Sequence, residues 1–167
     1  DEAVTIDITN LSTAQQKEIT MFLVDLVNQV RAQMGITLVS SNQSTADFAN
    51  TVVANYVNDG WKDKAGHDET ALSEAKDQYG VTNVRENIGY DNSSSLTTMD
   101  ALKKSVYYQT IAMLFADSYM NWGHAQNLTN TGYYEVKPEG YTDYLGLSVR
   151  SDSTDGIVAI HYEYAQD

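Results

Sequence analysis

The segment STAQQKEITMFLVDLVNQVRAQMG, residues 12–35, has the clearest structural pattern in the chain. Its apolar side chains recur at steps of three and four residues, which is the spacing of one face of an α-helix. The hydroxyl side chains of Ser12 and Thr13 can cap exposed N–H groups at the start, and Gly35 can end the helix. The segment therefore predicts a long amphipathic helix with one face turned to a core. Its apolar positions are Ile19, Phe22, Leu23, Leu26, Val27, Val30 and Met34.

The sequence beyond this helix predicts three more helices and then two strands. Ser44 or Thr45 is expected to cap the second helix, and the turn pair Asp155-Gly156 is expected to join the two strands as a hairpin. Helices thus dominate the first two thirds and antiparallel strands the last third, which predicts an α+β fold. The expected helices cover about 45–58, 71–79 and 97–115, and the expected strands cover 144–149 and 157–164.

The composition excludes several classes of protein. Ten basic and 23 acidic side chains give the 167 residues a formal net charge of −13, so the chain has no long-range attraction for nucleic acid or anionic lipid. No run approaches the ~20 apolar residues of a membrane span, so we expect no membrane insertion. Without cysteine, the chain has no disulfide framework and no thiolate ligand or nucleophile.

The length and continuous patterning predict one domain over residues 12–167, preceded by an arm over residues 1–11 that is loose or forms a short edge strand. The chain begins Asp1-Glu2-Ala3, with neither a methionine nor an apolar leader. We therefore expect a mature or excised fragment whose targeting signals lie outside it.

Two of the three histidines follow glycine, in Gly66-His67 and Gly123-His124. Glycine lets the backbone turn sharply, so it can present an imidazole to a cleft. Core periodicity does not place these two histidines, and we take His67 and His124 as candidates for one shared site. The alternative is that each is an ordinary loop histidine, solvated or hydrogen-bonded for structure.

Glu86 is the candidate acidic residue. It lies in the run Val84–Tyr90, which we expect to be extended or looped, beside a short apolar stretch. A half-buried glutamate near histidines can act as a general base or orient an imidazole. The alternative, favoured without further context, is that Glu86 pairs with Arg85 or caps a neighbouring helix.

The third histidine, His161, lies on the last predicted strand. Strand alternation puts His161 and Glu163 on the face opposite Ile160, Tyr162 and Tyr164. We expect His161 on the solvent side or stacked at a sheet edge, and not as a ligand.

Short motifs follow one another in a definite order along the chain. They are LVNQVR (26–31), Phe48-Ala49, Gly66-His67, Glu86-Asn87-Ile88, GHAQNL (123–128), LGLSV (145–149) and Ile160-His161-Tyr162. Across residues 12–164 this order resembles the CAP superfamily, the cysteine-rich secretory, antigen five and pathogenesis-related (SCP-like) proteins. The chain is similar to the cysteine-free bacterial branch, and residues 66–68, 113–117 and 122–125 resemble the domain found in surface-exclusion proteins of Gram-positive bacteria.

This resemblance implies a three-layer α-β-α sandwich with a central antiparallel sheet. It also implies a cleft in which two histidines and one or two acidic residues converge, and the matching positions are His67, Glu86 and His124. Arg85 stands where these proteins usually have glycine, and their second glutamate has no clear match. Asp117 is the nearest candidate, because it precedes His124 by seven residues, or two turns if helical, so both can face the cleft.

Two imidazoles and water can hold a divalent metal ion. We expect His67 and His124 to be the ligands and zinc to be the ion, with Glu86 orienting an imidazole. Protein zinc sites usually have three or four ligands, so two histidines imply modest affinity and a cofactor that is not obligatory.

The first functional hypothesis is a non-catalytic extracellular binding module on a Gram-positive cell surface or cell wall, mediating exclusion, adhesion or ligand capture. Its partner would be a cell-surface, small-molecule or peptide ligand, and we expect a monomeric domain of a larger protein. The second hypothesis is a metal-dependent hydrolase of peptide or cell-wall material that uses His67, Glu86 and His124. A purely structural surface module, in which the cleft residues are relics, is the third.

Overall fold

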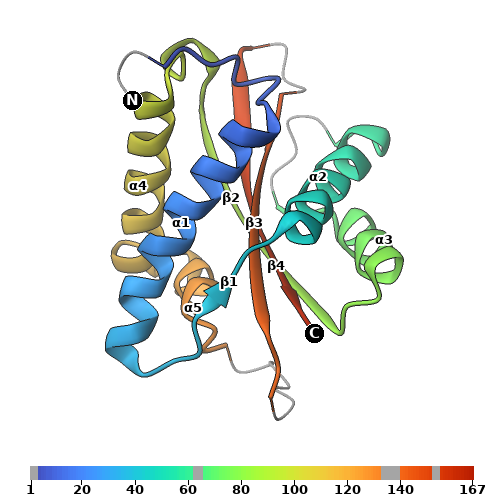
Figure 1. Cartoon of the computed structure of the whole chain (residues 1–167), viewed down its shortest axis with the longest axis vertical. Coiled ribbons are helices and arrows are strands. Elements are labelled where there is room, and N and C mark those ends of the chain that lie inside the picture. The colour runs from blue at the N-terminus through green and yellow to red at the C-terminus, as the bar shows by residue number, and fades with distance from the viewer. Residues whose placement is uncertain (1–3, 62–65, 133–139, 152–154) are drawn as a thin grey trace.

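A four-stranded sheet lies between two layers of helices (Figure 1), so the expected α+β sandwich is confirmed. The computed structural model describes residues 4–61, 66–132, 140–151 and 155–167. The strand order is β1-β3-β4-β2, in which the three long strands are antiparallel and short β1 runs parallel to β3. The sheet is therefore mixed rather than wholly antiparallel. The strands are β1 (Val39–Ser40), β2 (Asn83–Asn92), β3 (Asp143–Arg150) and β4 (Ile157–Gln166).

Helices cover both faces of the sheet (Figure 1). On one face lie α1 (Thr13–Met34), α4 (Met99–Phe115) and α5 (Gly123–Thr129), and on the other lie α2 (Gln43–Asn58) and α3 (Glu69–Tyr79). Two short 3₁₀ helices, η1 (Ser93–Ser95) and η2 (Ser118–Met120), flank α4. No helix in the described ranges is long and apolar enough to cross a membrane.

Each face of the sheet has its own hydrophobic core. Successive side chains of a strand point to opposite faces, so Tyr162 and Tyr164 pack with α1 and α4, whereas Ala159 and Ala165 pack with α2 and α3. Gly146 allows α2 to approach β3 closely, because a Cβ at this position would lie 2.6 Å from the carbonyl oxygen of Thr45. The N-terminal segment also contributes, since Ile6 and Ile8 are buried in the first core.

The ends of the helices follow their capping residues. Ser12 caps α1 with a capping box and Gly35 ends it in the left-handed conformation, as predicted. For α2 the predicted cap is wrong: Asn42 lies before the helix and accepts the N–H of Thr45 at 3.0 Å. Asparagine caps as well as serine, and its position three residues before Thr45 gives the capping geometry.

Candidate functional site

Glu86 lies on β2 at the centre of a cluster of polar side chains. The hydroxyl of Tyr56 donates to Glu86 Oε1 at 2.6 Å, and His67 Nδ1 lies 2.6 Å from the same oxygen. His161 Nδ1 lies 2.8 Å from Oε2. Burial raises the pKa of Glu86, but the hydrogen bonds from His161 and His67 outweigh it, and the pKa lies below its ordinary value. Glu86 is therefore a buried carboxylate with partners on both oxygens.

His67 is held at this carboxylate by the start of α3. The N–H of Asp68 donates to the Tyr56 hydroxyl at 2.7 Å, and the Asp68 side chain caps α3 through Thr70 and Ala71. The His67 side chain stays 35% exposed, so one side of its ring faces solvent. The hydrogen bond to Glu86 raises the pKa of His67 above its ordinary value.

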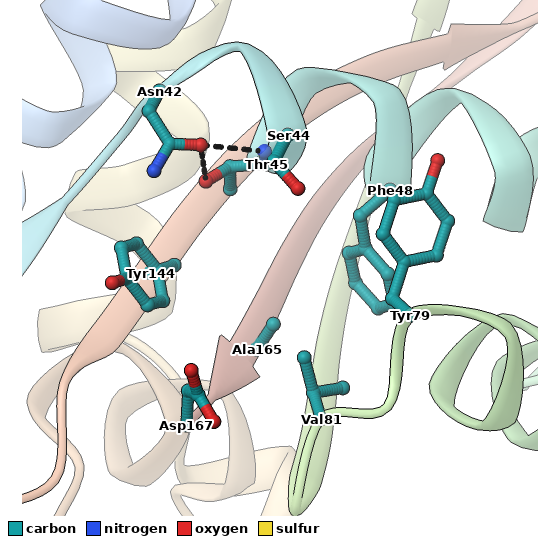
Figure 2. Close-up of a pocket in the computed structure, with 9 residues that line it drawn as sticks. All are labelled: Asn42, Ser44, Thr45, Phe48, Tyr79, Val81, Tyr144, Ala165 and Asp167. Atoms are coloured by element: carbon teal, nitrogen blue, oxygen red, sulfur yellow. Dashed lines mark hydrogen bonds between the residues drawn. The ribbon is translucent and has the colours of Figure 1, made fainter.

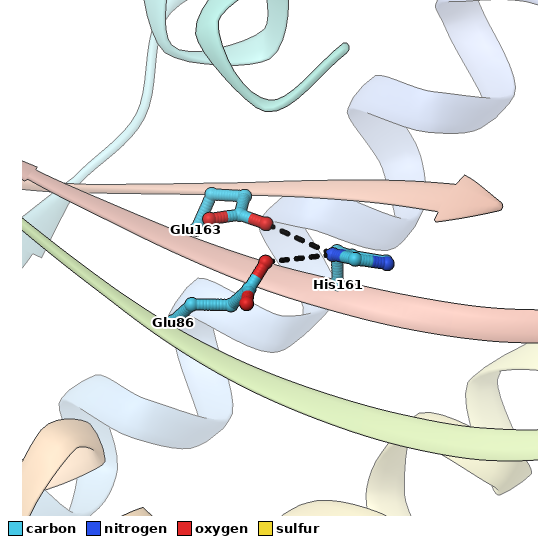
Figure 3. A group of neighbouring side chains, drawn as sticks. All are labelled: Glu86, His161 and Glu163. Atoms are coloured by element: carbon cyan, nitrogen blue, oxygen red, sulfur yellow. Dashed lines mark hydrogen bonds and ion pairs between the residues drawn. The ribbon is translucent and has the colours of Figure 1, made fainter. Parts of the chain in front are cut away.

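Figure 3 shows Glu86, His161 and Glu163, whose ligand-capable atoms lie within 4.8 Å of one another. Glu163 is directly opposite Glu86 across β2 and β4, and its Oε1 lies 3.1 Å from His161 Nδ1. Burial, and then the charge of Glu86, raise the pKa of Glu163 well above its ordinary value, while burial lowers the pKa of His161. Burial therefore favours the neutral forms of Glu163 and His161, while hydrogen bonds favour the charged form of Glu86.

The expected exposure of His161 is wrong. Its side chain is fully buried, with its ring edge-on to Tyr56 at 4.8 Å between centroids. The reason is topological: β4 lies between β3 and β2, and α2 covers this face of β4. His161, Glu163 and Tyr56 are therefore residues of the cluster that sequence reasoning missed, although strand alternation had already put His161 and Glu163 on one face.

Asp117 and His124 form a second pair. Asp117 Oδ1 lies 2.7 Å from His124 Nδ1, while Oδ2 accepts the backbone N–H groups of His124 and Ala125 at 2.9 and 3.4 Å. One buried carboxylate thus caps α5 and orients its imidazole. The two residues do not share a helix, because α4 ends at Phe115 and α5 begins at Gly123.

The His67–Glu86 pair and the His124–Asp117 pair are held at adjacent residues of β2. Glu86 belongs to the first pair, and the side-chain amide of Asn87 donates to the carbonyl oxygen of His124 at 3.1 Å. Asn127 of α5 donates back to the carbonyl oxygen of Glu86 at 3.1 Å. In the part of the chain that the structure describes, no hydrogen bond involves Nε2 of His67 or of His124. A shared site of the two imidazoles stays a prediction.

Arg85 does not pair with Glu86. Its Nη2 lies 2.6 Å from Asp143 Oδ1, and Arg31 Nη1 lies 2.6 Å from Oδ2 of the same carboxylate. The side chains of Arg85 and Glu86 leave β2 on opposite faces, because they are neighbours in a strand. Arg85 thus links β2 to Asp143 of β3 on the face of the sheet opposite Glu86. It does not compete with His67 and His161 for the Glu86 carboxylate.

A separate pocket of about 170 Å³ lies at the carboxyl end of β4 (Figure 2). Phe48 and Tyr79 line one side, and Tyr144 and Asp167 line the other. None of the predicted site residues lines this pocket. The candidate site is therefore the pair of histidine–carboxylate groups on β2 and α5.

Comparison with known proteins gives a family and a fold. The family model described as CAP, the cysteine-rich secretory protein family, matches residues 24–136. No curated protein sequence matches the chain significantly.

Three solved structures illustrate the shared fold. The CAP domain of enterococcal PrgA is 24% identical with a TM-score of 0.77, over 98% of this chain and 66% of that one. A cysteine-rich secretory protein from Staphylococcus aureus subsp. aureus Mu50 is 16% identical with a TM-score of 0.55, over 93% of this chain and 40% of that one. NaASP2 with Zn²⁺ is 10% identical with a TM-score of 0.53, over 93% of this chain and 83% of that one. The chain thus spans less than two thirds of the first two of these proteins.

Proposed function

Because this chain belongs to the CAP (cysteine-rich secretory protein) family, we propose that it is an extracellular binding module displayed on a Gram-positive cell surface. In this proposal the module binds a divalent metal ion, and zinc is the ion that we expect. Its other ligand is a cell-surface, small-molecule or peptide ligand, and the module catalyses no reaction. The fold shared with the CAP domain of enterococcal PrgA supports the bacterial surface setting. The similarity to NaASP2, a protein solved with Zn²⁺, supports the choice of ion.

The observation that carries the metal proposal is the way both imidazoles are held. His67 and His124 each turn Nδ1 to a buried carboxylate, and each leaves Nε2 without a hydrogen bond among the described residues. A carboxylate on Nδ1 fixes the tautomer that has its lone pair on Nε2, which is the usual arrangement of zinc-binding histidines. Two such nitrogens suit zinc, and water would complete its coordination.

Zinc titration by calorimetry tests this proposal directly. We expect one ion per chain for the wild type, and loss of binding in both His67→Ala and His124→Ala. Equal weak binding in all three proteins would overturn the shared site. Glu163→Gln is the matched control, since binding lost in this variant and kept in His67→Ala would assign the ion to the buried cluster of Glu86, His161 and Glu163 instead.

We propose that the site is non-catalytic because the carboxylates of Glu86 and Asp117 are already hydrogen-bonded within the protein. Both oxygens of Glu86 and both oxygens of Asp117 already accept hydrogen bonds from side chains or backbone. A general base needs a free lone pair within hydrogen-bonding reach of the water it deprotonates. Both carboxylates are buried and each already accepts three hydrogen bonds from the protein, so we propose that they orient the imidazoles rather than deprotonate a water.

The second candidate is a metal-dependent hydrolase of peptide or cell-wall material at the same place. Bound zinc would supply Lewis acidity and lower the pKa of a coordinated water. Release of soluble fragments from peptidoglycan or a peptide library by the zinc-loaded wild type, reduced at least tenfold in Glu86→Gln, would favour the enzyme. No turnover by the wild type on either substrate would favour the binding module.

A further inference from the structure

The pocket at the carboxyl end of β4 exists because α2 begins short of this end of the sheet (Figure 2). The first turn of α2 lies directly against Gly146 of β3, where a Cβ would be 2.6 Å from the carbonyl oxygen of Thr45. Tyr144 lies two residues nearer the start of β3 on the same face, and it is only partly buried. Its neighbour on β4 is Ala165, whose small side chain leaves room beside the start of the helix. Strands and a helix thus form most of the pocket.

Aromatic rings bound the pocket on two sides. Phe48 and Tyr79 lie on one side, with their rings edge-on at 5.5 Å between centroids, and Tyr144 lies on the other. The Tyr79 hydroxyl lies 3.2 Å from Oγ1 of Thr51, and Phe48 is only 2% exposed, so both rings are held in place. Aromatic faces attract cations and also pack well against aliphatic chains.

Asp167 is the one charged residue among the described residues that line the pocket, and none of them is basic. Two hydrogen bonds of 2.9 and 3.1 Å join its backbone to that of Thr142, which fixes its position beside the start of β3. Figure 2 shows Asp167 between Tyr144 and Val81. Its side-chain carboxylate has no hydrogen bond or ion pair with any residue that the structure describes. A negative charge without a basic neighbour favours a cationic ligand.

The volume of the pocket limits the size of this ligand. At about 170 Å³ it is close to the roughly 150 Å³ of an engineered cavity that binds benzene. It is smaller than the about 300–1,000 Å³ of pockets that enclose drug-sized molecules. The pocket therefore suits one long side chain of a larger ligand.

We propose that this pocket binds the side chain of a lysine or an arginine in a peptide ligand. The aliphatic stem of that side chain packs between the aromatic rings, while its charged head lies over Tyr144 and pairs with Asp167. An acidic side chain is repelled by Asp167. The net charge of −13 attracts basic peptides to the chain as a whole, and the pocket selects the side chain that enters. The inference rests on the peptide-binding form of the proposed function, and it uses no residue of the metal site.

A nuclear magnetic resonance titration of the metal-free chain tests the proposal. The ligands are the N-acetyl methylamides of arginine, lysine, norleucine and glutamate, which differ in charge on similar stems. We expect arginine and lysine to shift the backbone amide signals of pocket residues, with dissociation constants on the order of millimolar for such small ligands. Norleucine should bind about threefold or more weakly, because it lacks the ion pair and the cation–π contact, and glutamate should not bind. Added salt should weaken the binding of arginine.

Asp167→Asn should abolish the preference for arginine over norleucine, because it removes the charge and keeps the shape of the side chain. Tyr144→Ala should weaken the binding of both ligands. Asp59→Asn is the matched control, since it removes the same charge from an exposed residue at the other end of α2 and should keep the preference. Circular dichroism checks that all three variants are folded.

Three results would overturn the proposal. They are equal binding of arginine and norleucine by the wild type, a preference for arginine that Asp167→Asn retains, and signal shifts confined to residues outside the pocket. Absence of binding by all four ligands overturns it as well. Zinc calorimetry on the same proteins keeps the two proposals apart. A chain that binds zinc but no basic side chain contradicts this inference alone, and a chain that binds arginine but no zinc contradicts the metal proposal alone.

Discussion

Glu86 and Glu163 are two carboxyl groups placed directly opposite each other in a fully covered part of the sheet. Two negative charges at this separation in a buried place cannot coexist, so one group keeps its proton. Glu86 has the donors: Tyr56, His67 and His161 all point at its oxygens. We therefore expect Glu163 to be the neutral member, with a side chain close in shape and polarity to glutamine.

A pair of amide substitutions tests this assignment. Glu163→Gln should change the free energy of unfolding by less than about 1 kcal/mol, because one neutral hydrogen-bonding group replaces another. Glu86→Gln should cost about 3 kcal/mol or more, since it removes the charge that three partners surround. Urea unfolding of both variants at neutral pH measures the difference. If the two substitutions cost the same, the proton is not on Glu163.

The contact of His67 with Glu86 should make stability depend on pH with a definite sign. The hydrogen bond to Glu86 raises the pKa of His67 above its ordinary value of 6.5. The stabilisation is therefore complete below that value, and it is lost as pH rises through the higher folded-state pKa. The difference in unfolding free energy between wild type and His67→Ala should be largest in mild acid and shrink toward alkaline pH.

Urea unfolding of both proteins over a pH series measures this difference. Solvent screens the partly exposed ring of His67, so we expect the pH-dependent part of this free-energy difference to be small. A difference that grows with pH would mean that neutral His67 is the form that Glu86 prefers.

At the scale of elements, α5 shows what local sequence rules miss. The residue at the N-cap position of α5 is Trp122, whose side chain makes no capping hydrogen bond, and Asn121 and Trp122 both adopt the left-handed conformation there. The cap comes from Asp117, which reaches back over η2 to the N–H groups of His124 and Ala125. The sequence suggested Asp117 as a partner of His124, but α5, the short helix that contains His124, was not predicted, because its cap lies outside the usual capping window.

Substitutions at Asp117 can separate its two tasks. Asparagine caps a helix as well as aspartate, so Asp117→Asn should cost no more than about 1 kcal/mol of stability. It should still weaken zinc binding by roughly 10- to 100-fold, because the amide holds the imidazole of His124 less well than a carboxylate.

Asp117→Ala should lose both functions, and urea unfolding with zinc calorimetry measures the two losses side by side. Zinc affinity that is unchanged in both variants would show that the orientation of His124 does not matter for the metal.

At the scale of the whole molecule, the sequence predicts the layers better than it predicts the environment of single side chains. Helical periodicity predicted α1 and α4, and strand alternation with the intervening turn predicted the β3–β4 hairpin. These features depend on residues that are close together in the sequence. Alternation also put His161 and Glu163 on one face. It could not say that this face is covered, because burial depends on strand order and on α2, which packs over the sheet from far away in the chain. For the same reason the sequence did not single out Tyr56 as a residue of the site.

The net charge of −13 gives a prediction for the whole fold. Like charges repel more strongly in the compact state than in the unfolded chain, so screening should stabilise the folded protein. The thermal midpoint should rise from low to moderate sodium chloride and level off once the screening length, about 10 Å at 0.1 M, is shorter than the spacing of surface charges.

Calorimetry in chloride and in sulfate separates this effect from the stabilisation caused by exclusion of salt from the protein surface. The stabilisation by exclusion continues to increase with sulfate concentration. A midpoint that falls as chloride is added would mean that attraction among the few basic residues and their acidic neighbours, such as Lys103 with Glu18, outweighs the repulsion. The acidic surface would then be a source of stability rather than a cost.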